Sequence, residues 1–217
     1  MGLLTRLLGR EELHEVRGSN VAAHMDALAG LEGCWSSETV RRRVRDIFFA
    51  VQRSWVERSP DIGEPYLTAQ MATRQELRID GLLRQGRVHM LENPLIEDLD
   101  FVDLDESPHP RVVARLMVSM VETIMDADTD AVVAGAPRQK IHRVEYWVLT
   151  NEGDGWRLAD VEMQDEGGRH LSAPLVSERY VGLSPESLLR ERYARDEIGL
   201  DEFETEMEQL LREGPAY

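Results

Sequence analysis

The stretch Val40–Arg58, VRRRVRDIFFAVQRSWVER, has the pattern of an amphipathic helix around which the rest of the chain can be organised. Its apolar residues recur mainly at intervals of three or four, as expected for a helix that buries one face. Ser36 or Ser37 can cap its start, and Pro60 ends it, because the residue before a proline is disfavoured in helical geometry. We expect the helix to lie across a curved sheet formed by the second half of the chain. The apolar residues are Val40, Val44, Ile47, Phe48, Val51 and Trp55.

Two further helices are expected before the first strand. Residues Glu11–Gly30 have a helical composition that fades at Gly18–Asn20 and then resumes. Another helix is predicted over Thr68–Gln85, and Gly86 can end it in the left-handed conformation that glycine adopts readily. The apolar residues expected on its buried side are Met71, Leu77, Leu82 and Leu83.

The sequence period changes after Gly86, and extended segments follow. Arg111–Met125 has apolar residues on both faces, which is typical of a central strand covered on two sides. Gln139–Thr150 and Trp156–Met163 are separated by a short link that contains glycine, which predicts an antiparallel hairpin. Helices followed by a four-stranded antiparallel meander predict an α+β fold with the helices on one face of a bent sheet. Two earlier extended segments, separated by Pro94, are Val88–Asn93 and Leu95–Asp105.

The composition limits the compartment and the partners. The 217 residues carry a formal net charge of −16, which would repel the phosphate backbone of nucleic acids. The single cysteine, Cys34, permits no intramolecular disulfide and fits a reducing, cytoplasmic compartment. Lys140 is the only lysine, and this preference for arginine indicates a GC-rich bacterial genome. We therefore expect an acidic bacterial protein that binds no nucleic acid.

The first ten residues, MGLLTRLLGR, form a separate amphipathic segment. Such a segment can lie on an anionic membrane surface, at the inner face of the cytoplasmic membrane, or it can dock on its own domain or on a second copy. It is too small for stable membrane anchoring by itself. The leucines of one side are Leu3, Leu4, Leu7 and Leu8, and the arginines of the other are Arg6 and Arg10.

Four arginines occupy the polar face of the Val40–Arg58 helix: Arg41, Arg42, Arg43 and Arg45. In an acidic chain this cluster could receive an anionic lipid head group or an acidic partner. Alternatively, it is a solvated surface whose arginines pair with neighbouring carboxylates. The sequence leaves both interpretations open.

Two motifs resemble a known family. VEYWVLTNEGDGWRLADVEM, Val144–Met163, resembles the last two strands of the Tim44-like domain. RVRDIFFAVQRSWVERS, Arg43–Ser59, resembles the first conserved segment of that domain, and its signature positions would be Phe49, Gln52 and Trp55. The family belongs to the nuclear-transport-factor-two-like superfamily of cone-shaped α+β folds. The resemblance implies a non-enzymatic module that attaches to membranes or binds protein partners.

The C-terminal stretch Ser184–Leu211 resembles the short C-terminal (SHOCT) domain, a helical hairpin found at the ends of many bacterial proteins. A hairpin of this size buries little surface alone, so we expect it to pack on the core or on another chain. Homo-oligomers could form through this hairpin or through the N-terminal helix. The predicted parts are an N-terminal helical extension, a Tim44-like domain, a linker and a SHOCT-like hairpin, at residues 1–35, 36–164, 165–183 and 184–213.

The cone of this superfamily usually encloses a pocket between the sheet and the helices. A histidine or carboxylate in an apolar pocket can acquire a near-neutral pKa, so a small-molecule isomerase or hydrolase is the alternative function. No second catalytic group stands at a meaningful spacing, and the histidines lack the spacing of a zinc site. We therefore predict a binding or scaffold module without catalytic residues, metal or cofactor, which recognises a protein segment or a lipid. The expected pocket residues are Tyr66, His89, His142, Glu145 and Trp147.

The membrane interpretation of the first ten residues predicts that their deletion abolishes flotation of the protein with liposomes that contain anionic lipids. The leucines would supply the buried apolar area, and the arginines would supply the electrostatic attraction. Flotation of the full chain and of the chain lacking residues 1–10 measures this difference. Equal flotation of the two proteins would contradict the membrane interpretation.

Overall fold

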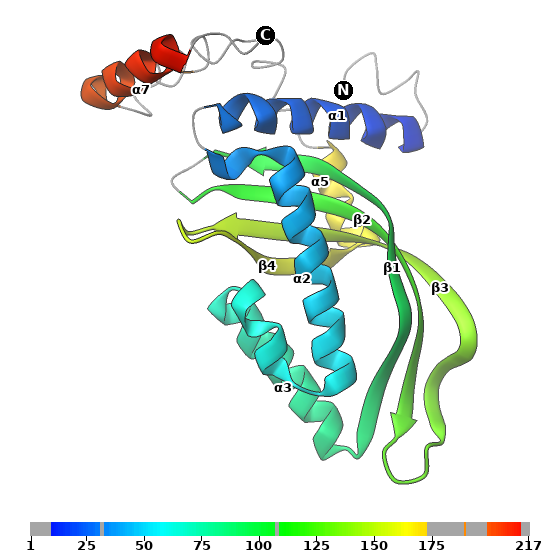
Figure 1. The fold of residues 1–217 in the computed structure, drawn as a ribbon. Helices are drawn as coiled ribbons and strands as arrows, with labels where there is room; N and C mark the ends of the chain where they lie inside the picture. Colours follow the sequence, from blue (N-terminus) through cyan, green and yellow to red (C-terminus); the bar gives the residue numbers. More distant parts are fainter. Residues whose placement is uncertain (1–9, 31–32, 107–108, 173–188, 190–198, 214–217) are drawn as a thin grey trace. The chain divides into compact units, whose positions relative to one another are not determined.

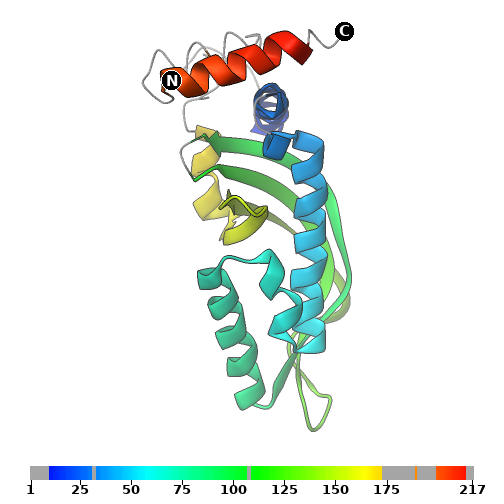
Figure 2. The ribbon, with the colours of Figure 1, turned by 60° about the vertical axis from the view of Figure 1, so that its left-hand side comes forward.

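The computed structural model describes residues 10–30, 33–106, 109–172, 189 and 199–213. The chain divides into two units, one formed by residues 1–40 and 174–217 and the other by residues 41–173. The second unit contains the whole sheet (Figures 1 and 2).

Four antiparallel strands form one sheet in the order β1-β2-β3-β4. Each strand pairs with its neighbours in the sequence, so the sheet is a simple meander, and it is strongly curved (Figure 1). The predicted α+β fold with a bent antiparallel sheet is therefore confirmed. The strand bounds are Arg87–Asp105 for β1, Arg111–Asp126 for β2, Val132–Asn151 for β3 and Trp156–Met163 for β4.

β1 continues through Pro94, where the sequence predicts an interruption. The register with β2 shifts between Glu92 and Leu95, and Asn93 takes a left-handed conformation with a φ of 51°. A bulge at this point accommodates the proline without ending the strand. The two predicted segments are thus one strand.

β3 begins at Val132 and not at Gln139, where the sequence predicts its start. Its first residues run close to β2, and a Cβ atom at Gly135 would lie 2.2 Å from the carbonyl oxygen of Glu122. The left-handed φ of 82° at Gly135 and the absence of a side chain permit this approach. Strand pairing therefore extends into a segment whose glycine and proline content resembles a loop.

Helix α2 (Ser37–Glu57) lies across one face of the sheet, here called the inner face (Figures 1 and 2). The helix predicted from the sequence is confirmed to within a few residues at each end. Its Phe48 ring packs against Trp147 of β3, with ring centroids 5.8 Å apart. Burying one large apolar side chain contributes about 1.5–3 kcal/mol, so this contact surface is a main source of stability. The fully buried inner-face residues of β2 are Val112, Ala114, Leu116, Val118 and Met120.

Helix α3 (Ala69–Arg84) has defined caps at both ends. The Thr68 hydroxyl oxygen accepts the Met71 backbone N–H at 3.3 Å, and Gly86 follows the helix with a left-handed φ of 63°. The predicted glycine stop is therefore confirmed. Two short 3-10 helices precede α3, η3 (Pro60–Ile62) and η4 (Glu64–Tyr66).

The buried side of α3 differs from the prediction. Leu77 and Leu83 were expected to be buried, but they are 59% and 42% exposed. The buried side chains of α3 instead recur at intervals of four residues. One of them is a glutamine, so the pattern of apolar residues alone does not identify this side of the helix. The buried residues are Met71, Gln75 and Ile79.

Two single-turn helices, α4 (Gln164–Gly167) and α5 (Arg169–Ser172), cover part of the opposite face of the sheet, here called the outer face. A Cβ atom at Gly167 would lie 2.1 Å from the Tyr146 ring, so only glycine fits there. Leu171 packs against an apolar cluster on this face. The first residues of the predicted linker over residues 165–183 are thus helical and pack on the sheet, while residues 173–183 lie outside the described part of the chain. The buried cluster consists of Val102, Val113 and Tyr146.

His170 holds α5 on the outer face. Its Nδ1 lies 3.2 Å from Asp103 Oδ2, and its Nε2 lies 3.2 Å from Glu162 Oε2. The ring also stacks on Tyr146, with centroids 6.2 Å apart. Both ring nitrogens of His170 therefore lie within hydrogen-bond distance of a carboxyl group on the sheet.

In the other unit, α1 (Arg10–Ala29) is one continuous helix. The predicted weakening at Gly18–Asn20 does not interrupt it. The Asp26 carboxylate accepts the Ser37 backbone N–H at 2.8 Å and the Ser37 hydroxyl at 2.9 Å. The short η2 (Gly33–Trp35) lies between α1 and α2.

The second helix of the predicted C-terminal hairpin is α7 (Leu200–Glu213). The stretch 190–198, which includes most of the first helix, lies outside the described residues. The same holds for Leu3, Leu4, Arg6, Leu7 and Leu8 of the proposed membrane segment. Their assignments stay predictions.

Two arginines of α2 hydrogen-bond backbone carbonyl groups on the two outer strands of the sheet. Arg41 Nη1 donates to the carbonyl oxygen of Leu99 on β1, and its guanidinium lies 5.3 Å from the centre of the Phe101 ring. Arg43 Nε donates to the carbonyl oxygen of Trp156 on β4 at 2.9 Å. Outer strands carry backbone groups without a strand partner, so these bonds satisfy groups that another chain could otherwise pair with.

Replacing Arg41 by leucine should lower the free energy of unfolding by about 1.5–3 kcal/mol, the usual contribution of a hydrogen bond to a charged group. The matched R42L variant changes an exposed arginine on the next residue and should alter stability by no more than about 0.5 kcal/mol. Urea denaturation followed by tryptophan fluorescence compares the two variants. Equal losses would contradict the structural role of Arg41.

Candidate functional site

The alternation of side chains along β3 places Arg143, Glu145 and Trp147 on the inner face of the sheet. Glu145 is buried, and its two carboxylate oxygens accept hydrogen bonds from Arg143 Nε at 2.5 Å and from Trp147 Nε1 at 2.8 Å. Both partners are two residues away along the same strand. Strand geometry alone therefore builds this part of the site.

Arg143 connects this group to β2 and β1. Its Nη1 donates to Glu122 Oε2 at 2.8 Å, and Glu122 Oε1 lies 2.7 Å from His89 Nε2. Because an ionised carboxylate only accepts, we assign the hydrogen of this bond to His89 Nε2. We call His89, Glu122, Arg143, Glu145 and Trp147 the interior polar network.

The electrostatics of the network favour the ionised form of Glu122. The hydrogen bond from His89 is the main cause that lowers the pKa of this carboxyl, and the positive charge of Arg143 lowers it further, while partial burial acts in the opposite direction. A general acid or base works best with a pKa near the operating pH. The lowered pKa of Glu122 therefore fits a structural ion pair better than a proton-transfer role.

Aromatic side chains of α2 cover the network. The Trp55 ring meets His89 edge to face, with centroids 5.2 Å apart and an interplanar angle of 75°. Trp147, which contacts Phe48, is only 1% exposed. Its ring therefore belongs to the hydrophobic core, and the predicted role of Trp147 as a pocket wall stays a prediction.

Tyr66 and His142, the other two predicted pocket residues, lie elsewhere. The Arg43 guanidinium lies over the Tyr66 ring, 4.6 Å from its centre. His142 stands on the outer face, with a side chain that is 56% exposed and an Nδ1 3.1 Å from Glu97 Oε2. Neither residue contributes to the interior polar network.

The structure thus brings together His89, Glu145 and Trp147 of the predicted pocket residues. Two further members of the network, Glu122 and Arg143, were missed. Arg143 could have been found, because the alternation along β3 already places it on the face of Glu145. Glu122 carries no such signal, since it meets Arg143 only through the pairing of β2 with β3.

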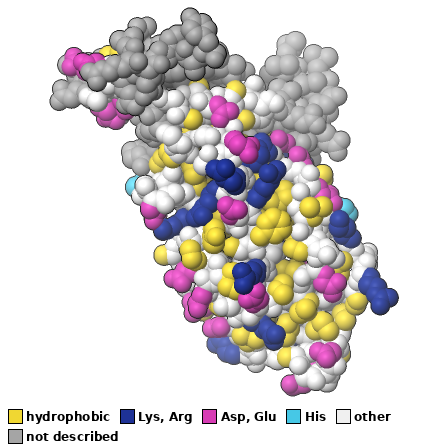
Figure 3. All heavy atoms as spheres, in the orientation of Figure 1, with side chains coloured by type: hydrophobic (Ala, Val, Ile, Leu, Met, Phe, Trp, Pro, Cys, Tyr) yellow, Lys and Arg dark blue, Asp and Glu magenta, His cyan; other side chains and the backbone are white. Residues whose placement is uncertain are grey.

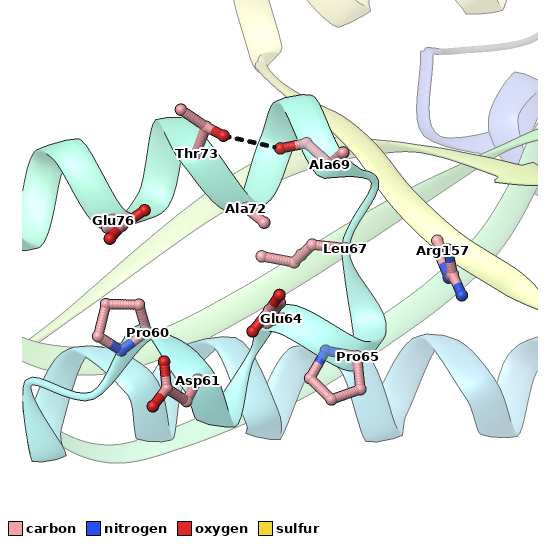
Figure 4. A pocket seen from close by; sticks show the side chains of 10 residues that line it. All are labelled: Pro60, Asp61, Glu64, Pro65, Leu67, Ala69, Ala72, Thr73, Glu76 and Arg157. Carbon is pink, nitrogen blue, oxygen red and sulfur yellow. Dashed lines mark hydrogen bonds between the residues drawn. The ribbon is translucent and has the colours of Figure 1, made fainter.

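A hollow of about 610 Å³ lies beside η3, η4 and the start of α3 (Figure 4). Carboxylates from the 3-10 turns and from α3 give it an acidic character. Arg157, the arginine that lines the hollow, pairs with Asp154, which is not a lining residue. The hollow therefore suits the positively charged side chain of a protein segment. Its apolar lining residues are Pro60, Pro65, Leu67, Ala69 and Ala72, and its polar ones are Asp61, Glu64, Thr73, Glu76 and Arg157.

The four arginines predicted to contact an anionic partner fall into two pairs. Arg41 and Arg43 bind carbonyl groups of their own sheet. Arg42 and Arg45 are exposed to solvent. Contact with an anionic partner stays a prediction for the exposed pair.

Within residues 10–30, 33–106, 109–172, 189 and 199–213, no group of three or more histidine, cysteine, aspartate or glutamate side chains is placed to hold a metal ion. None of the helices in the described part of the chain is both long enough and apolar enough to cross a membrane.

A sequence profile of the Tim44-like domain matches residues 21–163, well over half of the chain. The chain belongs to the Tim44-like domain family. The match includes α2, α3 and the whole sheet, so the interior polar network lies within the Tim44-like domain. Gln52, at an expected signature position, is buried, whereas Phe49 is 49% exposed. Packing on the sheet therefore does not account for the aromatic side chain of Phe49.

Among solved structures, 32 chains match. One of them is the intermembrane space region of the chloroplast protein ARC6, with 13% sequence identity and a TM-score of 0.43. The match covers 58% of this chain and 94% of that one. A comparison with curated proteins finds no match.

The E122Q substitution should make the free energy of unfolding less dependent on pH in the acidic range. The pKa of Glu122 is lower in the folded protein than its ordinary value of 4.5, so its ionisation stabilises the fold above that value. This contribution is lost as the pH falls through the folded-state pKa. Glutamine cannot ionise, so the E122Q curve should decline less below about pH 4.5.

Urea denaturation between pH 7 and pH 3 measures this difference. The H89A variant removes the hydrogen bond that is the main cause of the lowered pKa and should also decline less steeply than the wild type. Parallel curves for the wild type and E122Q would show that Glu122 has no such role.

Proposed function

We propose that this Tim44-like protein is a protein-binding scaffold module without catalytic activity. The match to the Tim44-like domain supports the non-enzymatic binding module that the resemblance of the sequence motifs implies. The observation that carries the proposal is that the interior polar network is satisfied by its own members. Glu145 accepts two hydrogen bonds, Glu122 is bound on both oxygens, and Trp147 is in the core. Binding is therefore assigned to the outside of the domain.

One such binding surface lies on the exposed side of α2. Phe49 is 49% exposed, and its ring is held edge to face against Phe48 with centroids 5.3 Å apart. Figure 3 shows basic and hydrophobic side chains together on the face of the molecule that carries α2. We call Arg42, Arg45, Phe49 and Arg53 the α2 outer surface.

The chemistry of the α2 outer surface fits an acidic partner with an apolar anchor. A preoriented aromatic ring with arginines on the same helix face is the composition found at the centre of many binding interfaces. The Arg53 guanidinium is already paired with Glu57 at 2.5 Å, which leaves Arg42 and Arg45 as the exposed cationic groups. These two residues are also the part of the arginine cluster that could meet an anionic lipid head group.

The terminal segments complete the proposed scaffold. The SHOCT-like hairpin, of which α7 is the second helix, would mediate assembly with another protein or with a second copy. The leucine-rich first ten residues would place the module at the inner face of the cytoplasmic membrane. Both assignments rest on sequence patterns, and the flotation experiment described above tests the second.

The F49A variant should weaken binding of a captured protein partner by at least about fivefold, the usual threshold for an interface residue that matters. The partner is captured from native lysate with the full chain, purified, and titrated by calorimetry. V133A removes an equally exposed apolar side chain on β3 and serves as the matched control. H89A should leave the affinity unchanged.

Two results would overturn the proposal. One is an equal loss of affinity in F49A and V133A, which would show that the α2 outer surface is not the binding surface. The other is turnover of a small-molecule substrate that depends on His89, which would show that the interior polar network is catalytic.

A further inference from the structure

β3 is much longer than the strand that pairs with its outer side. β4 pairs with β3 only from Glu145 to Asn151. Before Glu145, β3 has a sheet partner on one side, β2, and no described residue outside the sheet hydrogen-bonds its backbone. In Figure 1 this part of β3 forms the outer boundary of the sheet. A row of backbone N–H and C=O groups is therefore available for pairing.

This open edge has a defined length. After Met163 the chain turns onto the outer face, where Gly167 packs on Tyr146, so the described residues 164–172 do not pair with this edge. At the other end the register jumps from Lys140 to Gly135, and the residues between them, which include the left-handed Arg138, interrupt the regular pairing with β2. The regular open edge is therefore residues 140–144, about 17 Å of strand. We call it the β3 edge.

The side chains around the β3 edge are basic. Residues 131–144 contain no aspartate or glutamate, although the chain carries a net charge of −16, and they include the only lysine, Lys140. Lys140 and His142 point to the outer face and share one carboxylate, Glu97, at 3.7 Å and 3.1 Å. On the inner face, Ile141 is half-buried and Arg143 is bound within the interior polar network.

We propose that the β3 edge binds an extended protein segment with alternating acidic and apolar residues, which adds a strand to the sheet beside β3. Backbone hydrogen bonds would supply affinity, and the alternation would supply specificity. Acidic side chains would face Lys140 and His142, and apolar side chains would lie on the side of Ile141. A second copy of this chain does not fit, because pairing two β3 edges would place basic side chains opposite each other.

This inference rests on the proposed scaffold function and adds a second surface with its own partner chemistry. The α2 outer surface and the β3 edge lie on different elements, so one module could hold two partners. The two proposals can also fail separately, since one is tested with a captured protein and the other with a short peptide.

The test uses the full chain and a fluorescein-labelled peptide of alternating glutamate and valine, seven residues long, with blocked ends. Fluorescence anisotropy should show saturable binding. A peptide methylated on alternate backbone nitrogens should not bind, because it cannot pair along the strand. K140E should weaken binding about 3- to 10-fold, as expected when an attractive cross-strand charge pair becomes repulsive. K140Q should give a smaller loss.

R78E is the matched control, because it reverses an exposed arginine on α3 without touching β3. It should bind the peptide like the wild type. The proposal is overturned by equal binding of the methylated peptide, by equal binding of an alternating lysine and valine peptide, or by an equal loss in R78E and K140E. If the wild-type chain captures the protein partner but does not bind the peptide, the role of the β3 edge is refuted and the proposed scaffold function is not.

Discussion

Arg41 and Arg43 leave the same helix and hydrogen-bond carbonyl groups on β1 and β4, the two outer strands of the sheet. Between them, the apolar stripe of α2 is buried on the inner face. The helix is thus held at both edges of the sheet and along its middle. The rest of the domain depends on this placement, because it closes the inner face and positions Trp55 against His89 and Phe48 against Trp147.

Because α2 covers the inner face, the polar groups there need hydrogen-bond partners within the protein, and their meeting depends on the register of the strands. Glu145 is the buried charged member of the network, and a buried charge destabilises a fold unless it has a partner such as Arg143. Here His89, Glu122 and Arg143 come from β1, β2 and β3 and meet in one chain of hydrogen bonds. A slip of one residue in any of these strands would turn the side chains to the other face. The network therefore helps to specify the strand register, and the rigid domain that results can present binding surfaces on its outside.

Several elements could be predicted from the sequence because their signals are local. The three- and four-residue spacing of Val40–Arg58 predicts α2, the glycine after α3 predicts its end, and the glycine-containing link predicts the β3–β4 hairpin. The errors also have physical causes. A proline usually ends a strand, but here a bulge accommodates Pro94 and β1 continues. Residues 165–172 have the composition of a linker, yet Gly167 fits only against Tyr146, a residue from a distant strand.

The sequence by itself determined the α+β class, the order of the elements, the resemblance to the Tim44-like family and the face of β3 that carries Glu145 and Trp147. Only the tertiary structure decided that Glu122 joins them, that Trp147 lies in the core, and that His142 stands on the outer face. It also decided that Arg41 and Arg43 bind the sheet while Arg42 and Arg45 face outward. The reason is that periodicity specifies which side chains share a face, whereas strand register and helix rotation decide which polar groups meet across elements.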